Sequence, residues 1–501
     1  MERRIKALIG VFLLAVGFLF SKIFYIGTVK NEKYSKEVAA QMEASLPVWS
    51  VRGTIYDRNL IPLTERQASL LHITDKAMIA KGDGDGAFLL PSRYDENGFG
   101  THIIGYASKD GEGKCGIEKK FDAFLKSDNV YTVAYTKNAI GGPVKNTKAK
   151  MDFESLDKMG GISLTLDYHI QKAAEEVMDA FLPKGAVVVL DVESFEVLAM
   201  ASRPTYSYDD IENYLKSDKG ELLNRALCAY NAGSVFKIVT AASALEGNSM
   251  FQNKSFFCDG SFEYGTKSFA CHKADGHGEE TFFNAFANSC NCAFYETSLL
   301  VGAKKIADTA KKLGLGERIL HMGDEEAKGF VPKGDIFMPL ECINLGIGQG
   351  DILITPLQCT VMAATVANGG VRKEVSIAKN ATDENGVPFL SLEKEQSIKA
   401  MSEPTAKTLA KMMRECVLSG TAKSIASSPL EIAGKTGSAE TGWQNDDGTF
   451  MVHGWFCGFF PYSAPKYAIT VFCEDGKSGA KSCVEPFLEL CEKIERIYPI
   501  K

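Results

Sequence analysis

A long apolar segment near the N-terminus is the feature that most restricts how this chain can fold. Residues Ala7–Val29 are almost entirely apolar, and the segment is long enough to cross a bilayer as one helix. Lys22 lies near one end, where its aliphatic stem can reach the interface. Because Arg3, Arg4 and Lys6 precede the segment, we expect the N-terminus to be cytoplasmic and residues beyond 30 to lie outside.

A cleaved signal peptide is the alternative interpretation of this segment. No convincing small-x-small cleavage site follows it, which favours an uncut anchor. The rest of the sequence contains no second candidate span, so the prediction is a single-pass membrane protein with its catalytic domain outside the cytoplasm. We divide it into a cytoplasmic stub and anchor (1–30), a mixed domain (31–160) and a larger domain (161–501).

Length and charge exclude some classes of protein. The 501 residues are 45% hydrophobic and 24% charged, which allows two or three domains with a large core. The net charge of −7 gives no reason to expect a nucleic-acid partner. Thirteen cysteines, an odd number, leave at least one thiol unpaired, and their scattered positions suggest that most are small buried apolar residues.

One group of cysteines and histidines is concentrated in a short stretch. Cys258 and Cys271 flank a glycine- and aromatic-containing segment, 259–270, that is typical of a hairpin, and a disulfide between them could bridge it. A zinc site is the alternative, but the spacings match no standard zinc pattern, so we expect neither metal nor organic cofactor. The residues weighed for zinc are Cys258, Cys271, His272, His277, Cys290 and Cys292.

The larger domain has strand patterns at both of its ends and helical patterns between them. This order predicts an α+β domain whose sheet is assembled from both ends of the segment. The expected strands are Ile162–Leu166, Ala186–Leu190, Glu196–Ala201, Glu431–Ala439, Gly454–Phe460 and Tyr467–Glu474, and the expected helices include one capped by Asp167, Thr405–Leu418 and Glu485–Ile497.

Three short motifs in this domain carry candidate chemistry. In the first, Ser234 stands at the start of a helical run and Lys237 follows one turn later, so its amine can reach the hydroxyl and activate it as a nucleophile. The second is Ser289-Cys290-Asn291, whose hydroxyl and amide could relay a proton and orient a substrate amide. The third, Lys435-Thr436-Gly437-Ser438, offers a cation and a hydroxyl to a carboxylate, and its glycine permits close approach to the strand.

Each motif alone is weak, but the ordered set S-x-x-K, S-x-N and K-T-G is typical of penicillin-binding proteins and class A β-lactamases. Segments that flank the motifs make the match more specific, and the chain resembles class B penicillin-binding proteins over nearly its whole length. The segments that carry the resemblance are Val51–Asn59 (R-G-x-I-x-D-R-N), Gly116–Glu118 (G-I-E), Val188–Ser202, Gly348–Gly350 with Thr355–Gln358, Gly434–Glu440 and His453–Phe456.

The sequence departs from the family pattern at two positions. Ala232 replaces the usual proline before Gly233-Ser234, and Leu60 replaces the usual glycine of the first signature. Neither change removes a reacting group. The resemblance therefore implies a transpeptidase domain of the penicillin-binding and serine β-lactamase fold, with an antiparallel sheet, flanking helices and a helical subdomain, behind a membrane-proximal pedestal domain.

The resemblance also implies a reaction. Ser234 would attack the penultimate carbonyl of a stem peptide ending in D-Ala-D-Ala, on lipid-linked or nascent peptidoglycan, and an amine from a second stem would resolve the acyl-enzyme. Lys237 would be the base, Ser289 would relay the proton and Asn291 would hold the donor backbone. Lys435 and Thr436 would bind the terminal carboxylate, and the N–H groups of Ser234 and Ser438 would form the oxyanion hole.

A β-lactam would trap the acyl-enzyme, and a SEDS-type glycan polymerase is the partner implied by the family. Four alternatives remain. Three have the same fold, namely a β-lactamase, a D,D-carboxypeptidase and a β-lactam sensor, and the fourth is an inactive cell-wall scaffold. The intact motifs argue against the scaffold, and the uncut anchor with a pedestal suits wall synthesis better than β-lactam hydrolysis.

Overall fold

A computed structural model describes residues 1–95, 98–151, 159–333, 338–392, 396–444 and 448–500. By internal contacts the chain forms two units: Met1–Val51 with Gln67–Arg93 and Ser127–Lys158, and Arg52–Arg66 with Tyr94–Lys126 and Met159–Lys501. Two segments of the expected pedestal therefore pack within the second unit. The domain limits drawn from the sequence at residues 30 and 160 stay a prediction.

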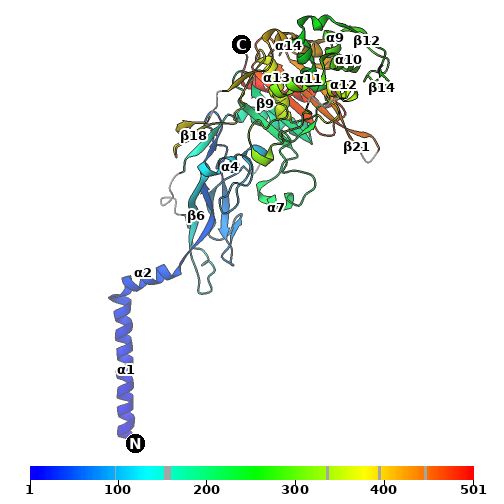
Figure 1. Cartoon of the computed structure of the whole chain (residues 1–501). Coiled ribbons are helices and arrows are strands. Elements are labelled where there is room, and N and C mark those ends of the chain that lie inside the picture. The colour runs from blue at the N-terminus through cyan, green and yellow to red at the C-terminus, as the bar shows by residue number, and fades with distance from the viewer. Residues whose placement is uncertain (96–97, 152–158, 334–337, 393–395, 445–447, 501) are drawn as a thin grey trace. The chain divides into compact units, whose positions relative to one another are not determined.

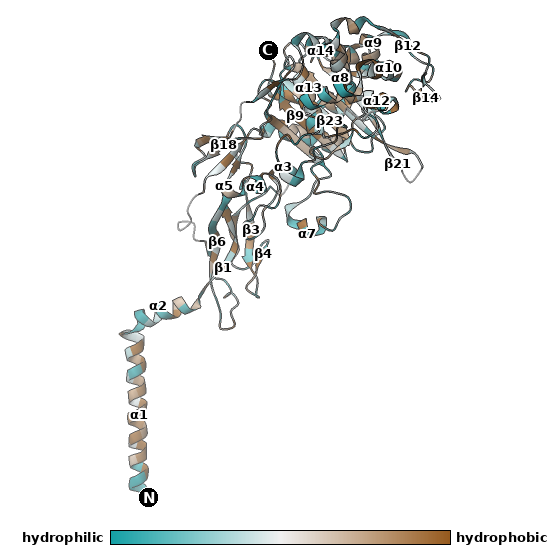
Figure 2. Ribbon diagram, in the orientation of Figure 1, coloured by the Kyte–Doolittle hydropathy of each residue, from teal (hydrophilic) through white to brown (hydrophobic). Residues whose placement is uncertain are grey.

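The first unit begins with the expected apolar helix, α1 (Glu2–Thr28), whose residues are nearly all exposed and which is long and apolar enough to cross a membrane. In Figure 2 the ribbon of α1 has mostly the colour of hydrophobic residues. After α2 (Asn31–Met42) come two small sheets, ordered β1-β6-β7 and β4-β3-β5. Their strands are β1 (Glu43–Arg52), β3 (Gln67–Ile73), β4 (Ile79–Lys81), β5 (Phe88–Ser92), β6 (Lys126–Thr136) and β7 (Lys150–Met151).

The second unit is built on a five-stranded antiparallel sheet, ordered β10-β9-β23-β22-β21. The expected pairing of the two ends of this domain is confirmed, because β9 from the beginning pairs with β23 from the end (Figure 1). The strands are β9 (Gly185–Asp191), β10 (Val197–Arg203), β21 (Ala433–Gln444), β22 (Phe450–Phe460) and β23 (Tyr467–Cys473). The last strand in the order, β21, carries the K-T-G motif at the sheet edge.

Both faces of this sheet are covered, which explains the nearly continuous apolar sequence of its central strands. Along β9, Val187 and Val189 enter one hydrophobic cluster, while Val188 and Leu190 enter the other. The first cluster includes residues of α6 (Tyr168–Phe181) and α16 (Val484–Ile497). The second includes α8 (Lys237–Gly247) and α13 (Pro356–Ala367). The alternation of side chains along a strand therefore divides the core into two layers.

Helix starts in this unit follow the sequence signals. The Asp167 carboxylate accepts hydrogen bonds from the N–H groups of His169 and Ile170, as expected for an N-cap of α6. The Thr-Pro-Leu-Gln segment opens α13 with a capping box, in which Thr355 and Gln358 each donate a backbone N–H to the other's side chain at 3.1 Å. These caps fix the two helices that cover opposite faces of the sheet.

Helices and short hairpins form the helical subdomain above one face of the sheet. The helices are α8, α9 (Phe282–Ala287), α10 (Asn291–Val301), α11 (Ala303–Lys312), α12 (Pro339–Gly346) and α14 (Glu403–Leu418). The hairpin expected at 259–270 is present as β13 (Ser261–Tyr264) paired with β14 (Lys267–Ala270), and β12 (Ser255–Cys258) pairs with β15 (Gly278–Thr281). Four of the expected site residues lie on α8, α10 and the turns that precede them.

The first signature segment is tied to the G-I-E segment by a buried ion pair. Arg52 Nε donates to Glu118 Oε2 at 2.8 Å, and both side chains are almost fully buried. Leu60, where the family has glycine, has a φ of +62°. This is the left-handed region, which glycine adopts most easily. The backbone conformation therefore explains why glycine is the usual residue at this position.

Candidate active site

The turn that carries Ser234 lies directly against the K-T-G strand. Ser234 belongs to a single 3₁₀ turn, Gly233–Phe236, that leads into α8. Gly233 has a φ of +55°, and a Cβ built on it would lie 2.5 Å from the carbonyl oxygen of Ser438. Its N–H donates to the Gly348 carbonyl at 2.9 Å, so the G-Q-G segment supports the same turn. Only glycine fits between these two backbones.

The first and second motifs meet at the amine of Lys237, whose side chain is fully buried. Lys237 Nζ donates to the Ser289 carbonyl oxygen and to Asn291 Oδ1, both at 2.7 Å, and lies 3.2 Å from Ser289 Oγ. Ser289 has a φ of +60°, which is uncommon for a residue with a side chain. This strained conformation places both the carbonyl and the hydroxyl of Ser289 next to the Lys237 amine.

The third motif approaches the first through its glycine. A Cβ on Gly437 would lie 2.9 Å from Val235 Cγ1, the residue that follows Ser234. Gly479 N–H, at the start of α15 (Gly479–Ser482), donates to Ser438 Oγ at 3.1 Å and fixes that side chain. Ser234 is half-buried and Ser438 is exposed, so the junction of turn and strand is open to solvent.

Lys435 is completely buried, and its Nζ donates to the Thr436 carbonyl at 3.0 Å. The sequence led us to expect that Lys435 binds the substrate carboxylate, and this role stays a prediction. Thr436 Oγ1 lies 2.5 Å from Thr421 Oγ1, and its side chain is nearer the surface.

Burial and the neighbouring Lys435 ammonium lower the pKa of Lys237 to about 7. Burial likewise lowers the pKa of Lys435. A neutral Lys237 amine has two N–H groups, which the Ser289 carbonyl and Asn291 amide oxygens accept, and one lone pair. That lone pair can accept the proton of a serine hydroxyl near neutral pH, although no hydrogen bond to Ser234 Oγ is present among the described residues.

Sequence reasoning missed the aromatic side chains beside the two amines. Lys237 Nζ lies 5.2 Å from the Phe294 ring centre, and Lys435 Nζ lies 5.8 Å from that of Phe286. A ring face attracts a cation within about 6 Å, so these contacts oppose the effect of burial. The signal was available, since Phe286 and Phe294 flank the S-x-N motif by a few residues on each side.

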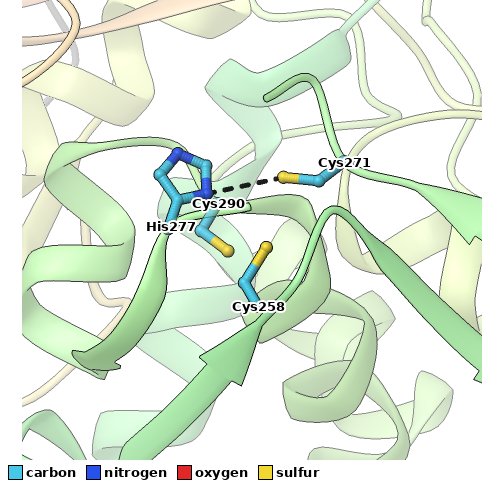
Figure 3. A group of neighbouring side chains, drawn as sticks. All are labelled: Cys258, Cys271, His277 and Cys290. Atoms are coloured by element: carbon cyan, nitrogen blue, oxygen red, sulfur yellow. Dashed lines mark hydrogen bonds between the residues drawn. The ribbon is translucent and has the colours of Figure 1, made fainter. Parts of the chain in front are cut away.

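The disulfide considered between Cys258 and Cys271 is not formed, and both thiols are free. Instead, their sulfur atoms approach His277 and Cys290 (Figure 3). His453 packs edge-on against Tyr230 and is almost fully buried. His272, the other histidine of the group, is exposed.

Comparison with known proteins gives one family over most of the second unit. The model of the penicillin-binding protein transpeptidase domain matches residues 185–489. Stage V sporulation protein D of Bacillus subtilis is 26% identical, over 91% of this chain and 79% of its own length. Peptidoglycan D,D-transpeptidase PbpA of Mycolicibacterium smegmatis is 29% identical, over 75% of this chain and 76% of its own.

Solved structures of penicillin-binding proteins have a fold similar to that of this chain. Penicillin-binding protein 3 of Mycobacterium tuberculosis, complexed with aztreonam, is 25% identical and superposes with a TM-score of 0.70, covering 91% of this chain and 98% of its own. A chain from a peptidoglycan synthase complex that coordinates polymerization and crosslinking has a TM-score of 0.71 at 23% identity, with 99% of both chains covered. At that identity the second likeness establishes the fold alone.

Proposed function

Because the chain belongs to the penicillin-binding protein transpeptidase family, we propose that it is a peptidoglycan D,D-transpeptidase that works through an acyl-enzyme on Ser234. One observation carries the assignment of residues. The Lys237 amine is held between Ser289 and Asn291 at the end of the turn that bears Ser234, and that turn lies against the K-T-G strand. A nucleophile, a base and a substrate-binding strand are thereby adjacent.

In the acylation half-reaction, Ser234 Oγ forms a bond to the penultimate carbonyl carbon of a D-Ala-D-Ala stem. The hydroxyl proton passes to the neutral Lys237 amine. The peptide C–N bond then breaks, and the terminal D-alanine leaves after taking a proton on its nitrogen. Ser289 is positioned to relay that proton, because its Oγ lies 3.2 Å from Lys237 Nζ.

The second half-reaction reverses these proton transfers. An amine of a neighbouring stem attacks the acyl-enzyme carbonyl, loses a proton to the site and displaces Ser234 Oγ. In both halves the carbonyl oxygen becomes negatively charged. The N–H groups of Ser234 and Ser438 are assigned as its donors, and each such donor contributes about 10²–10³ in rate in other enzymes.

The carboxylate of the donor stem is assigned to the K-T-G strand. Thr436 and Ser438 supply hydroxyl groups near the surface, while the buried Lys435 supplies positive potential from below. Asn291 can position the donor backbone with its amide nitrogen, since its Oδ1 is occupied by Lys237. A β-lactam would occupy the same positions and leave Ser234 acylated.

The apolar α1 fits a single-pass membrane anchor, and we assign its N-terminus to the cytoplasm because Arg3, Arg4 and Lys6 precede the apolar segment. The catalytic unit would then face the peptidoglycan side of the membrane. A transpeptidase that acts on lipid-linked precursor needs a source of glycan strands. We therefore assign a SEDS-type polymerase as its partner, contacted through the anchor and the membrane-proximal domain.

Fluorescent penicillin separates this function from its alternatives. The full chain in detergent should be labelled at Ser234, and the label should persist, whereas a β-lactamase would lose it quickly. A well-folded protein that takes no label would support the scaffold. Incubation with lipid-linked precursor and a polymerase then distinguishes a transpeptidase, which forms cross-linked muropeptides, from a carboxypeptidase, which releases D-alanine without cross-links. A β-lactam sensor would take a lasting label and yield neither product.

A further inference from the structure

Four side chains next to the active site converge on one point. Three thiol sulfur atoms and one imidazole nitrogen lie within 4.8 Å of one another, and the three thiols are buried (Figure 3). The four residues are Cys258, Cys271, His277 and Cys290, and we name them the Cys3His cluster.

The separations in the Cys3His cluster suit a tetrahedral metal site. Zinc binds sulfur at about 2.3 Å and imidazole nitrogen at about 2.0–2.1 Å, so ligand atoms around it lie about 3.6–3.8 Å apart. Cys271 Sγ and His277 Nδ1 are 3.6 Å apart. The remaining atoms, within 4.8 Å, need to close by about 1 Å at most to reach this geometry.

The backbone holds the four ligands from separate but linked segments. Cys258 ends β12 and pairs with Gly278, directly after His277. Cys271 follows β14, and its N–H donates to the Gly260 carbonyl at 2.8 Å. Cys290 precedes α10, and its N–H donates to the Ala285 carbonyl at 2.8 Å. Two hairpins and a helix start thus position the ligands, which is why their spacing in the sequence matches no single standard motif.

We propose that the Cys3His cluster binds one Zn²⁺ as a structural site. Three thiolates and an imidazole form one of the ligand sets of structural zinc, and the absence of carboxylate ligands in the cluster disfavours magnesium and calcium. Four protein ligands leave no open position for water. The ion therefore has no role in the bond-breaking steps and serves to fix the ligand segments.

This zinc site would position the second catalytic motif. Cys290 is the central residue of Ser289-Cys290-Asn291, and the Asn291 N–H donates to Cys271 Sγ at 3.4 Å. Asn291 Nδ2 also donates to the Ala270 carbonyl at 3.5 Å. An ion bound to both cysteines would hold Ser289 and Asn291 around the Lys237 amine, a consequence that rests on the function proposed above.

Metal analysis of the full chain, purified in detergent under reducing conditions, tests the site directly. We expect about one zinc per chain, and at least a tenfold lower content in Cys271→Ser. Cys491→Ser is the matched control, because Cys491 is a free thiol buried in the other core layer on α16, and it should keep its zinc. If the cluster variant does not fold, cobalt added to chelated wild-type protein should give the absorption bands of tetrahedral cobalt thiolate.

Two results would overturn the site: wild-type protein that contains little zinc and takes up neither zinc nor cobalt, or peptide mapping that finds Cys258 and Cys271 joined in a disulfide. Acylation is measured separately. Ser234→Ala should retain zinc and lose labelling by fluorescent penicillin, so failure of the enzyme assignment leaves the metal result intact. Zinc-free wild-type protein should acylate at least tenfold more slowly and recover when zinc is restored. Unchanged acylation without zinc would contradict the positioning role.

Discussion

Lys237 Nζ donates a 2.7 Å hydrogen bond to Asn291 Oδ1, so the amine that we propose as the base is oriented by the amide of the second motif. The same amine binds the Ser289 carbonyl at 2.7 Å. With both N–H groups of the neutral form engaged, the lone pair has a defined direction. The S-x-N motif therefore orients the amine that we propose as the base, in addition to any contact that the motif makes with substrate.

The acylation rate should rise with pH around neutrality. Burial and the Lys435 ammonium hold the pKa of Lys237 at about 7, and only the neutral amine can accept the Ser234 proton. Below that value the ammonium predominates and acylation slows by about tenfold per pH unit. Stopped-flow labelling by a β-lactam between about pH 6 and about pH 9 measures the profile.

Lys435→Gln tests whether the Lys435 ammonium is a cause of the lowered pKa of Lys237. Removing the neighbouring cation should raise the pKa of Lys237, and the midpoint of the profile should move to higher pH even if the overall rate falls. A profile that stays flat through neutrality in the wild-type protein would show that another group is the base.

Asn291→Ala should slow acylation by about ten- to a hundredfold, because a hydrogen bond between an amide and a buried amine is lost and the base is no longer oriented. Asn284→Ala is the matched control, since Asn284 is exposed on α9 and its hydrogen bonds among the described residues use backbone groups, the N–H to Thr281 and the carbonyl from Asn288. Single-turnover labelling rates with both variants test this, and equal rates for the two would refute the orienting role.

Gly233→Ala should impair acylation far more than backbone strain alone would. The new Cβ would lie 2.5 Å from the Ser438 carbonyl oxygen, so the nucleophile turn must move away from β21. Gly442→Ala isolates the strain, because Gly442 also has a positive φ but no atom within 4 Å of the new Cβ. Thermal unfolding should show a loss of about 1–2 kcal/mol in Gly442→Ala and a larger loss in Gly233→Ala, and loss of labelling should be confined to Gly233→Ala.

Leu60→Gly should stabilise the protein by about 1 kcal/mol. The left-handed conformation at Leu60 costs an L-residue about 1–2 kcal/mol, which exceeds the roughly 0.4–1 kcal/mol of extra unfolded-state entropy that glycine brings. Leu215 is also exposed but has a φ of −64°, so Leu215→Gly should destabilise instead. Denaturant unfolding that moved both midpoints in the same direction would contradict this explanation.

The assembly of the sheet from both ends of the larger domain could be predicted, because strand patterns occur at its two ends and helical patterns lie between them. Ala186–Leu190 and Tyr467–Glu474 were expected as strands, and they pair as β9 and β23. The apolar helix at the N-terminus and the Asp167 cap followed from equally local signals. The individual strands, the helix and the cap each depend on residues close together in the sequence, where spacing is informative.

Features created by tertiary approach could not be predicted in the same way. The positive φ of Ser289, the burial of Lys435 and the meeting of Cys258 with Cys290 depend on how α8, β12 and α10 pack. Sequence spacing can identify metal ligands that lie on one loop. The ligands of the Cys3His cluster instead come from two hairpins and a helix start. Spacing alone therefore could not show that these four side chains meet.

The most direct measurement of the central claim is intact-mass and peptide analysis of the full chain after reaction with a β-lactam. One adduct per chain, located on Ser234 and absent from Ser234→Ala, is the predicted result. An adduct on another side chain, or a folded wild-type protein that forms none, would contradict the assignment of Ser234 as the acylation site.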